Sequence, residues 1–203
     1  MKESFDPAGR DDVDIYKLLI GLVVPRPIGW IGSLSEEGVR NLAPFSFFNA
    51  VAASPPTVLF STIRAGGSKK DTLANVEQTR AFTVNVVTEQ VVDAMNVTAG
   101  RYDPSVDEFE LAGLTAIPGT VVAAPMVSEA KANLECRVTQ IVPIGTDGPM
   151  AASIVIGEVV RLHVDGSILD GTRIDQAALK AVGRMGGPTY TRTRDQFSLD
   201  RPG

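Results

Sequence analysis

Small, polar and aromatic residues alternate in the segment Asn41-Leu-Ala-Pro-Phe-Ser46. Pro44 favours an extended backbone, and Asn41 and Ser46 bring side chains that donate and accept hydrogen bonds. A flat heterocycle needs both a stacking surface and hydrogen bonds along one edge, so this segment suits a planar, polar ring. The alternative is a hairpin exit that Pro44 makes rigid, in which Asn41 and Ser46 are ordinary turn residues.

Hydroxyl and cationic side chains follow in two further segments. Ser61 and Thr62 stand at the end of a predicted strand, and Ser68-Lys-Lys-Asp-Thr72 stands at a predicted helix start, with Arg64 between the two. Backbone N–H groups and the helix dipole favour an anion at a helix start. Lys70 and a neighbouring hydroxyl would add charge-assisted hydrogen bonds to that anion.

Together, these segments could hold a planar ring at one end and a phosphate at the other. Flavin mononucleotide (FMN) has this shape. Asp71 fits better as a helix cap, or as a contact through its backbone, than as a carboxylate ligand of a phosphate, because like charges repel. The alternative for the helix start is a capping box formed by Ser68 and Asp71, with lysines that are simply solvated.

Composition and charge argue against several classes of function. The 203 residues, 44% of them hydrophobic, suit one domain with an elaborated periphery. The net charge of −5 and the pI of about 4.9 argue against binding to nucleic acid through a basic surface. The single cysteine, Cys136, excludes an intrachain disulfide and a cysteine-based metal site, and we predict no metal. The apolar runs are far shorter than the roughly 20 residues of a membrane helix, which indicates no membrane association. The first residues contain no apolar signal segment, so we expect a cytoplasmic location.

Short strands open and close the chain, with short helices between them. β-Branched runs and apolar–polar alternation predict strands at 28–34, 39–42, 57–62, 82–87, 134–139 and 152–164. Capping patterns predict helix starts at Ser68 and Ser105, and apolar spacing predicts a helix within 88–97. Many short strands separated by glycine and proline favour a mainly β fold, a closed or nearly closed antiparallel barrel with short peripheral helices. No Gly-x-Gly-x-x-Gly follows a strand, so a Rossmann nucleotide domain has no support. We predict a loose N-terminal segment (1–14), one domain (15–190) and a polar tail (191–203).

The order of nine short motifs carries a family resemblance. They are Pro25-Arg-Pro-Ile-Gly-Trp-Ile31, Asn41-Leu-Ala-Pro-Phe-Ser-Phe-Phe-Asn49, Ser54-Pro-Pro56, Lys70-Asp-Thr-Leu-Ala-Asn75, Phe82-Thr-Val-Asn85, Asp107-Glu-Phe-Glu-Leu-Ala-Gly-Leu114, Leu134-Glu-Cys136, Ile156-Gly-Glu158 and Gly183-Arg184. In this order they resemble the flavin reductase-like and flavoredoxin-like branch of the FMN-binding split-barrel superfamily, over about residues 14 to 202. Each motif alone would be weak evidence, and the shared order makes the resemblance strong.

The resemblance implies a six-stranded antiparallel split barrel, usually a homodimer, with FMN bound near the subunit interface. It implies flavin-ring contacts at Asn41, Ala43, Pro44, Phe45 and Ser46. It implies phosphate contacts at Ser61, Thr62, Lys70, Asp71 and Thr72, to which Arg64 could add positive charge.

His163 is the only histidine of the chain and lies in the predicted strand 152–164. A lone histidine in a strand is most often a surface or interface residue. In the resembling family a histidine in this strand often lies near the nicotinamide or the flavin face, which makes His163 the candidate catalytic side chain. The chemistry itself would belong to the flavin, while the protein supplies orientation and electrostatics.

Three functions follow as hypotheses from the resemblance. The leading one is an FMN-dependent oxidoreductase that takes hydride from NADH or NADPH and passes electrons to free flavin for a partner oxygenase, or to another small-molecule acceptor. The second is a non-catalytic FMN electron-transfer protein that serves a protein partner, and the third is a flavin-binding module without redox turnover. Trp30, Phe47 and Phe48 are predicted to belong to the core rather than to stack on a ligand. Late in the chain, Gly186-Gly187-Pro188 separates Arg184 from Tyr190, either as a loop that lets backbone approach a ligand or as a plain surface turn.

Overall fold

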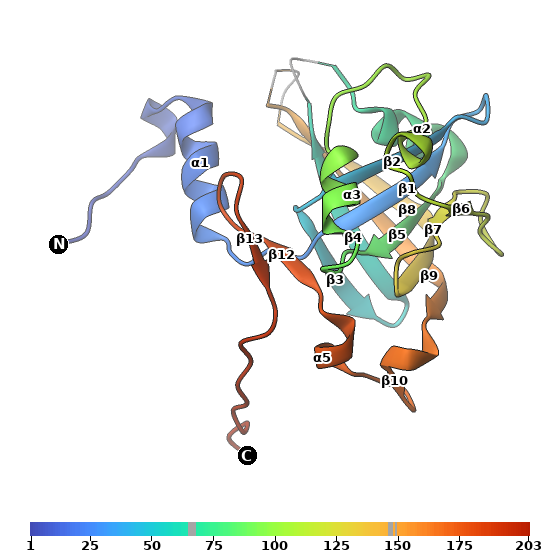
Figure 1. Ribbon diagram of the computed structural model, residues 1–203. Helices are drawn as coiled ribbons and strands as arrows, with labels where there is room; N and C mark the ends of the chain where they lie inside the picture. Colours follow the sequence, from blue (N-terminus) through green and yellow to red (C-terminus); the bar gives the residue numbers. More distant parts are fainter. Residues whose placement is uncertain (65–67, 146–147, 149) are drawn as a thin grey trace.

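One curved antiparallel sheet forms the body of the protein. The computed structural model describes residues 1–64, 68–145, 148 and 150–203. Seven strands pair in the order β2-β1-β5-β8-β9-β4-β3, all antiparallel (Figure 1). Their bounds are Gly29–Leu34 (β1), Arg40–Phe45 (β2), Phe48–Ala53 (β3), Pro56–Ile63 (β4), Ala81–Val86 (β5), Ala132–Ile144 (β8) and Ala152–Val164 (β9). The mainly β, antiparallel fold predicted from the sequence is confirmed, with seven strands in the main sheet where the resemblance implied six.

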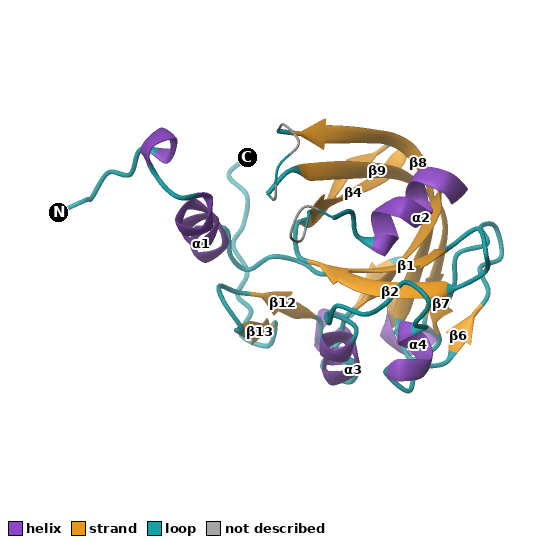
Figure 2. Cartoon of the chain, turned by 90° about the horizontal axis from the view of Figure 1, so that it is seen from above, coloured by secondary structure: helices purple, strands orange, loops and turns teal. Residues whose placement is uncertain are grey.

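The sheet curls until strands far apart in its order meet across the interior. Figure 2 shows β4 and β9 opposite β1 and β2, with helix α2 (Asp71–Thr79) between them. Phe45 of β2 and Phe60 of β4 have ring centroids 5.0 Å apart, and Phe60 lies 5.2 Å from Phe82 of β5. The apolar cluster around these rings is the barrel core, and Cys136 lies fully buried within it as a small hydrophobic residue.

Two glycines are required where the barrel packs most tightly. A side chain at Gly157 on β9 would come within 2.5 Å of the buried Phe82 ring. A side chain at Gly32 on β1 would come within 2.3 Å of the carbonyl oxygen of Pro125, because the loop before β7 (Met126–Val127) crosses β1 there. Real Cβ atoms do not make contacts this short, so only glycine lets these segments approach each other.

Short helices and hairpins surround the barrel. The helices are α1 (Asp12–Leu22), α3 (Val92–Val97), α4 (Glu108–Leu111) and α5 (Gln176–Leu179), with 3-10 turns at Pro7–Gly9 and Gly166–Ile168. Three two-stranded sheets pair β6 (Ala116–Ile117) with β7 (Met126–Val127), β10 (Leu169–Asp170) with β11 (Arg173–Ile174), and β12 (Val182–Arg184) with β13 (Tyr190–Arg192). Within the described residues, no helix is long and apolar enough to cross a membrane.

Two predicted helix caps are wrong. Helix α2 begins at Asp71 after the N-cap residue Lys70, whose side chain makes no capping hydrogen bond, so Ser68 and Asp71 form no capping box. Helix α4 is capped by Asp107, which accepts hydrogen bonds from the backbone of the next turn, and not by Ser105. Asp and Ser compete for such positions with similar preference, so spacing alone selected the wrong residue.

The aromatic residues expected in the core divide into two groups. Trp30 is fully buried, as predicted, and donates a hydrogen bond from its ring nitrogen to Thr98 over 2.9 Å. Phe47 and Phe48 are only half-buried, because they lie where β2 gives way to β3 at the edge of the barrel. Phe47 is therefore available to line a surface pocket.

Helix α1 stands away from the barrel on the side of the β12–β13 hairpin (Figure 1). None of its residues is buried, and Leu19 and Leu22 leave 51% and 78% of their surface exposed. Val23, just beyond the helix, is 58% exposed. An apolar helix face this open is typical of an interface.

Candidate functional site

Three adjoining pockets meet at Pro44 and Lys70, which line all three. The helix pocket, about 230 Å³, lies between β2, the start of α2 and the loop after α3. The strand pocket, about 410 Å³, lies between the end of β2, the end of β4 and α1. The hairpin pocket, about 450 Å³, lies between α1, α3 and the β12–β13 hairpin. The volumes of the strand and hairpin pockets are typical of small-molecule sites.

The residues predicted to hold a cofactor come from separate segments and gather at these pockets. The helix pocket contains Asn41, Ala43, Pro44, Lys70, Asp71 and Thr72, and the strand pocket contains Pro44, Phe45, Ser46, Ser61, Arg64 and Lys70. Thr62 is the exception. It is only 2% exposed and alternates with Ser61 along β4, so it shares the inward face of Phe60.

A buried hydrogen-bond network joins β2 to α2 beneath the helix pocket. The side-chain oxygen of Asn41 accepts hydrogen bonds from Thr72 Oγ1 over 2.7 Å and from Ser33 Oγ over 3.1 Å. The side-chain nitrogen of Asn41 donates to Glu108 Oε1 over 2.9 Å. Asn41 and Thr72, at 7% and 1% exposure, thus use their polar side-chain atoms inside the protein. Their role here is to position the pocket wall, and a ligand would meet their backbone.

Glu108 of α4 completes this network at the outer edge of the sheet. Its Oε2 accepts from the backbone N–H of Leu42 over 3.1 Å, which satisfies a donor that edge strand β2 would otherwise leave unpaired. Burial raises the pKa of Glu108, while the hydrogen bonds from Leu42 and Asn41 oppose that rise. Burial likewise raises the pKa of Asp71, whose negative charge contributes to the rise at Glu108.

Two cations face each other where the helix and strand pockets meet. The Lys70 ammonium lies 5.3 Å from the centroid of the Phe45 ring. Desolvation, followed by the positive charge of Arg101, lowers the pKa of Lys70. In the part of the chain that the structure describes, neither Lys70 nor Arg101 forms an ion pair, whereas Lys69 pairs with Glu77 over 2.6 Å. With the uncapped first turn of α2, this arrangement favours an anion.

Arg26 is a buried cation that joins three parts of the site. It is 5% exposed and donates to the carbonyl oxygens of Ile20 (2.7 Å), Val23 (2.6 Å) and Met185 (2.9 Å). A longer contact of 3.4 Å reaches Ser46 Oγ. A cation at these carbonyls suits the C-terminal end of α1. Arg26 thereby fixes α1, the end of β2 and the β12–β13 hairpin around one point.

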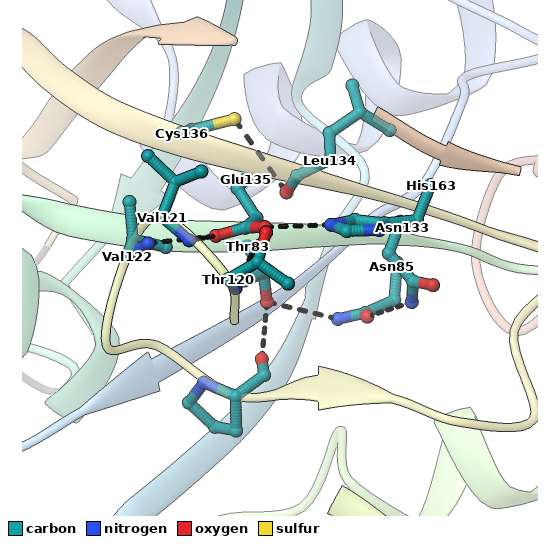
Figure 3. Close-up of polar contacts among 11 residues, drawn as sticks. Thr83, Asn85, Thr120, Val121, Val122, Asn133, Leu134, Glu135, Cys136 and His163 are labelled. Carbon is teal, nitrogen blue, oxygen red and sulfur yellow. Dashed lines mark hydrogen bonds and ion pairs between the residues drawn. The ribbon is translucent and has the colours of Figure 1, made fainter. Parts of the chain in front are cut away.

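His163 lies away from all three pockets. Strand β9 lies next to the strand pocket at Ser153 and Ile154, which pair with Thr62 and Ser61 of β4. His163 is nine residues beyond Ile154 on the same strand, so roughly 30 Å separates the two at about 3.3 Å per residue. Its Nε2 lies 2.7 Å from Oε1 of Glu135 on β8 (Figure 3). Within one chain, His163 therefore lines none of the pockets at Pro44.

The partner of His163 is a fully buried carboxylate that holds a loop in place. Glu135 accepts hydrogen bonds from Thr120 N and Oγ1 and from the backbone N–H groups of Val121 and Val122, as Figure 3 shows. Burial alone would raise the pKa of Glu135, but the hydrogen bonds from Thr120, His163 and the two backbone groups bring it well below its ordinary value. The pair fixes the loop before β7 to the sheet.

Several site residues were missed from the sequence. Arg101 and Tyr102 follow α3 in a loop without a recognisable pattern, and Tyr16 of α1 lines both the strand and the hairpin pockets. Only Arg26 carried a signal, since the Pro-Arg-Pro motif fixes an extended backbone around one charged side chain. No group of metal-ligating side chains occurs among the described residues.

Several known proteins are similar to this chain in sequence and fold. The flavin reductase-like domain family matches residues 21–178. Nitrilotriacetate monooxygenase component B from Bacillus cereus is 38% identical, with a TM-score of 0.94 over 98% of this chain and 99% of that one. The 2-nitrobenzoate 2-nitroreductase NbaA from Pseudomonas fluorescens is 30% identical, with a TM-score of 0.89 over 98% and 96%. A protein of Shewanella frigidimarina described as a flavin reductase with a split barrel domain is 23% identical, with a TM-score of 0.83 over 99% and 100%, and it supports the split-barrel fold alone.

Proposed function

Because the chain belongs to the flavin reductase-like family, we propose that it is an FMN-dependent oxidoreductase that takes hydride from NADH or NADPH. The electrons of this donor would reach free flavin or another small acceptor. The observation that carries the proposal is the meeting of three separate segments at Pro44 and Lys70, with a cationic, uncapped helix start beside an extended strand end.

The residues of the strand and helix pockets fit the two chemical ends of FMN. The backbone from Ala43 to Ser46 offers a polar edge for the ring system, and half-buried Phe47 supplies apolar surface beside it. Lys70 and Arg101 supply the charge for the phosphate, together with the first backbone N–H groups of α2. When bound, FMN supplies the capacity to accept a hydride and to release electrons afterwards.

The protein contributes binding and orientation. The Asn41 network holds the end of β2 at a fixed distance from the start of α2, so the ring and phosphate contacts keep their spacing. Arg26 fixes α1 and the β12–β13 hairpin as the outer walls. Because the chain has no dinucleotide-binding motif after a strand, the nicotinamide of the donor would stack on the exposed flavin face.

The similar proteins suggest two kinds of acceptor. Likeness to a monooxygenase component B favours free flavin handed to a partner oxygenase. Likeness to a 2-nitrobenzoate 2-nitroreductase favours a small nitroaromatic acceptor reduced at the same site. The rival from another class is an electron-transfer flavoprotein that is reduced by a protein partner.

Anaerobic mixing tests the proposal. The purified protein is loaded with FMN, NADH or NADPH is added, and the visible absorbance of oxidised flavin is followed by stopped flow. Bleaching within seconds, faster than for FMN alone, supports a reductase. Bleaching only with a protein donor would identify an electron carrier, and no reduction by either kind of donor would leave a flavin-binding module.

A further inference from the structure

We propose that the hairpin pocket binds the pyrophosphate of the nicotinamide hydride donor and that Arg184 is the residue that recognises it. The inference rests on the proposed function, because it assigns the second substrate of the same reaction. Pro44, Ser46 and Lys70 line both the hairpin pocket and the strand pocket, so a ligand in the hairpin pocket adjoins the proposed place of the flavin ring.

The hairpin pocket has the charge that a diphosphate requires. Its described lining residues include the cations Arg26, Lys70 and Arg184 and no carboxylate. The chain as a whole carries a net charge of −5, so the positive sign is local to this pocket. A concave site lined by one sign of charge concentrates the opposite ion.

Arg184 is the cation of the pocket best placed to bind a ligand. Its guanidinium lies 4.4 Å from the centroid of the Tyr190 ring, within the range of a cation–π contact. One of its nitrogens, Nη2, donates to the carbonyl oxygen of Gly187 over 2.6 Å, and Arg184 forms no ion pair with any other described residue. A planar guanidinium held in this way matches the paired oxygens of a phosphate group.

Arg26, which lies beside Arg184, has a different role in the pocket. Its donors are engaged by the carbonyls of α1 and of Met185, so it contributes charge and rigidity rather than direct recognition. The backbones of Arg26 and Arg184 also bond to each other in both directions, over 2.9 and 2.8 Å. Desolvation, with a further contribution from the charge of Arg184, lowers the pKa of Arg26, which is the effect expected of two cations close together.

The position of the hairpin explains how the donor is held without a nucleotide-binding domain. Both views place the β12–β13 hairpin between α1 and α3 (Figures 1 and 2). A nicotinamide ring stacked on the flavin would carry its pyrophosphate outward into this space. Tyr16 and Tyr190, at the two sides of the pocket, offer apolar surface to the attached sugar.

The test compares Arg184→Gln with Arg192→Gln in the FMN-loaded protein. Arg192 lies on the same hairpin but pairs with Glu89 and lines none of the three pockets, so its substitution controls for loosening of the hairpin. Stopped-flow reduction at increasing NADH and NADPH gives the dissociation constant of the donor and the limiting rate. We expect Arg184→Gln to raise that constant about tenfold or more and to reduce its salt dependence, with FMN affinity unchanged. Arg184→Lys should recover part of the loss.

Two results would overturn the assignment. Equal donor dissociation constants in the two glutamine variants would show that Arg184 does not recognise the donor, and loss of FMN from Arg184→Gln would place this residue in the flavin site instead. If neither NADH nor NADPH reduces the FMN-loaded wild type, the proposed function is refuted. The binding of inorganic pyrophosphate to the hairpin pocket is then measured by calorimetry. Weaker pyrophosphate binding in Arg184→Gln than in Arg192→Gln would support an anion site at Arg184 and refute the nicotinamide donor as its ligand. No pyrophosphate binding to the wild type would refute both the anion site and the donor.

Discussion

Replacing Lys70 with alanine separates recognition of the phosphate from recognition of the ring. Lys70 stands at the uncapped start of α2 with its ammonium over Phe45 and has no described ion-pair partner. A hydrogen bond to a charged group contributes about 1.5–3 kcal/mol. Lys70 as a whole residue is exposed, although neighbouring groups partly desolvate its ammonium, so the lower end of that range applies. We expect a loss of about 1.5 kcal/mol in FMN affinity, or roughly tenfold.

The assay is a binding titration of FMN and riboflavin, followed by flavin fluorescence at low and high salt. Riboflavin lacks the phosphate, so its affinity should be nearly the same in the wild type and in Lys70→Ala. The difference between wild type and variant for FMN should shrink as salt screens the charge. Lys69→Ala is the matched control, because Lys69 is the adjacent lysine but pairs with Glu77.

The reasoning would be refuted by equal losses for FMN and riboflavin in Lys70→Ala. That result would place the phosphate elsewhere and make Lys70 part of the ring site. A larger FMN loss in Lys69→Ala than in Lys70→Ala would also contradict it, because the ion pair of Lys69 would then have to open for the ligand.

Four further results are expected. Thr72→Val removes the hydroxyl that donates to buried Asn41, so urea unfolding should show that the unfolding free energy is about 1–3 kcal/mol lower. Any loss of affinity should be the same for FMN and for riboflavin. Glu135 has a lowered pKa in the folded state, so its contribution to the unfolding free energy is present above the ordinary carboxylate pKa and is lost as pH falls. In Glu135→Gln the unfolding free energy should therefore fall less between pH 6 and pH 3 than in the wild type. An identical fall in both proteins would contradict the lowered pKa of Glu135. His163→Ala should lower the unfolding free energy, because His163 contacts Glu135. The rate of flavin reduction by NADH should stay within about twofold of the wild-type rate, because His163 lines none of the three pockets. A much larger fall in that rate would indicate that His163 of a second subunit lies next to the flavin. Light scattering should give a homodimer, and Leu22→Glu on the exposed face of α1 should weaken it; a wild type of 21.5 kDa in solution would exclude the dimer.

The strands could be predicted well where one face is buried. The segment 152–164 is rich in β-branched residues and matches β9, and 28–34 matches β1 to within one residue. Strand β3 was missed because Phe48–Ala53 consists largely of small residues, five of them exposed, and has no apolar alternation to detect. The other six strands of the main sheet each overlap a strand predicted from the sequence.

The candidate site was predicted in outline, because its three segments are local in sequence and each carries a recognisable chemistry. Their internal bonding could not be foreseen. Asn41 bonds to Thr72 and Glu108, which lie 31 and 67 positions away, and no local pattern reports such pairs. Thr62 could have been separated from Ser61 on the sequence alone, since neighbours in a strand point to opposite faces.

The bond from Arg26 to Met185 joins residues 159 positions apart and has a consequence for how the protein matures. Chains are synthesised from the N-terminus, so every strand of the barrel is complete before the β12–β13 hairpin leaves the ribosome. Until then the carbonyl of Met185 is missing from the contacts of Arg26, and the hairpin pocket lacks one wall. A nascent chain that ends before Val182 would hold a barrel whose hairpin pocket lacks the wall formed by β12 and β13. A chain shortened before Val182 should therefore bind the nicotinamide donor poorly.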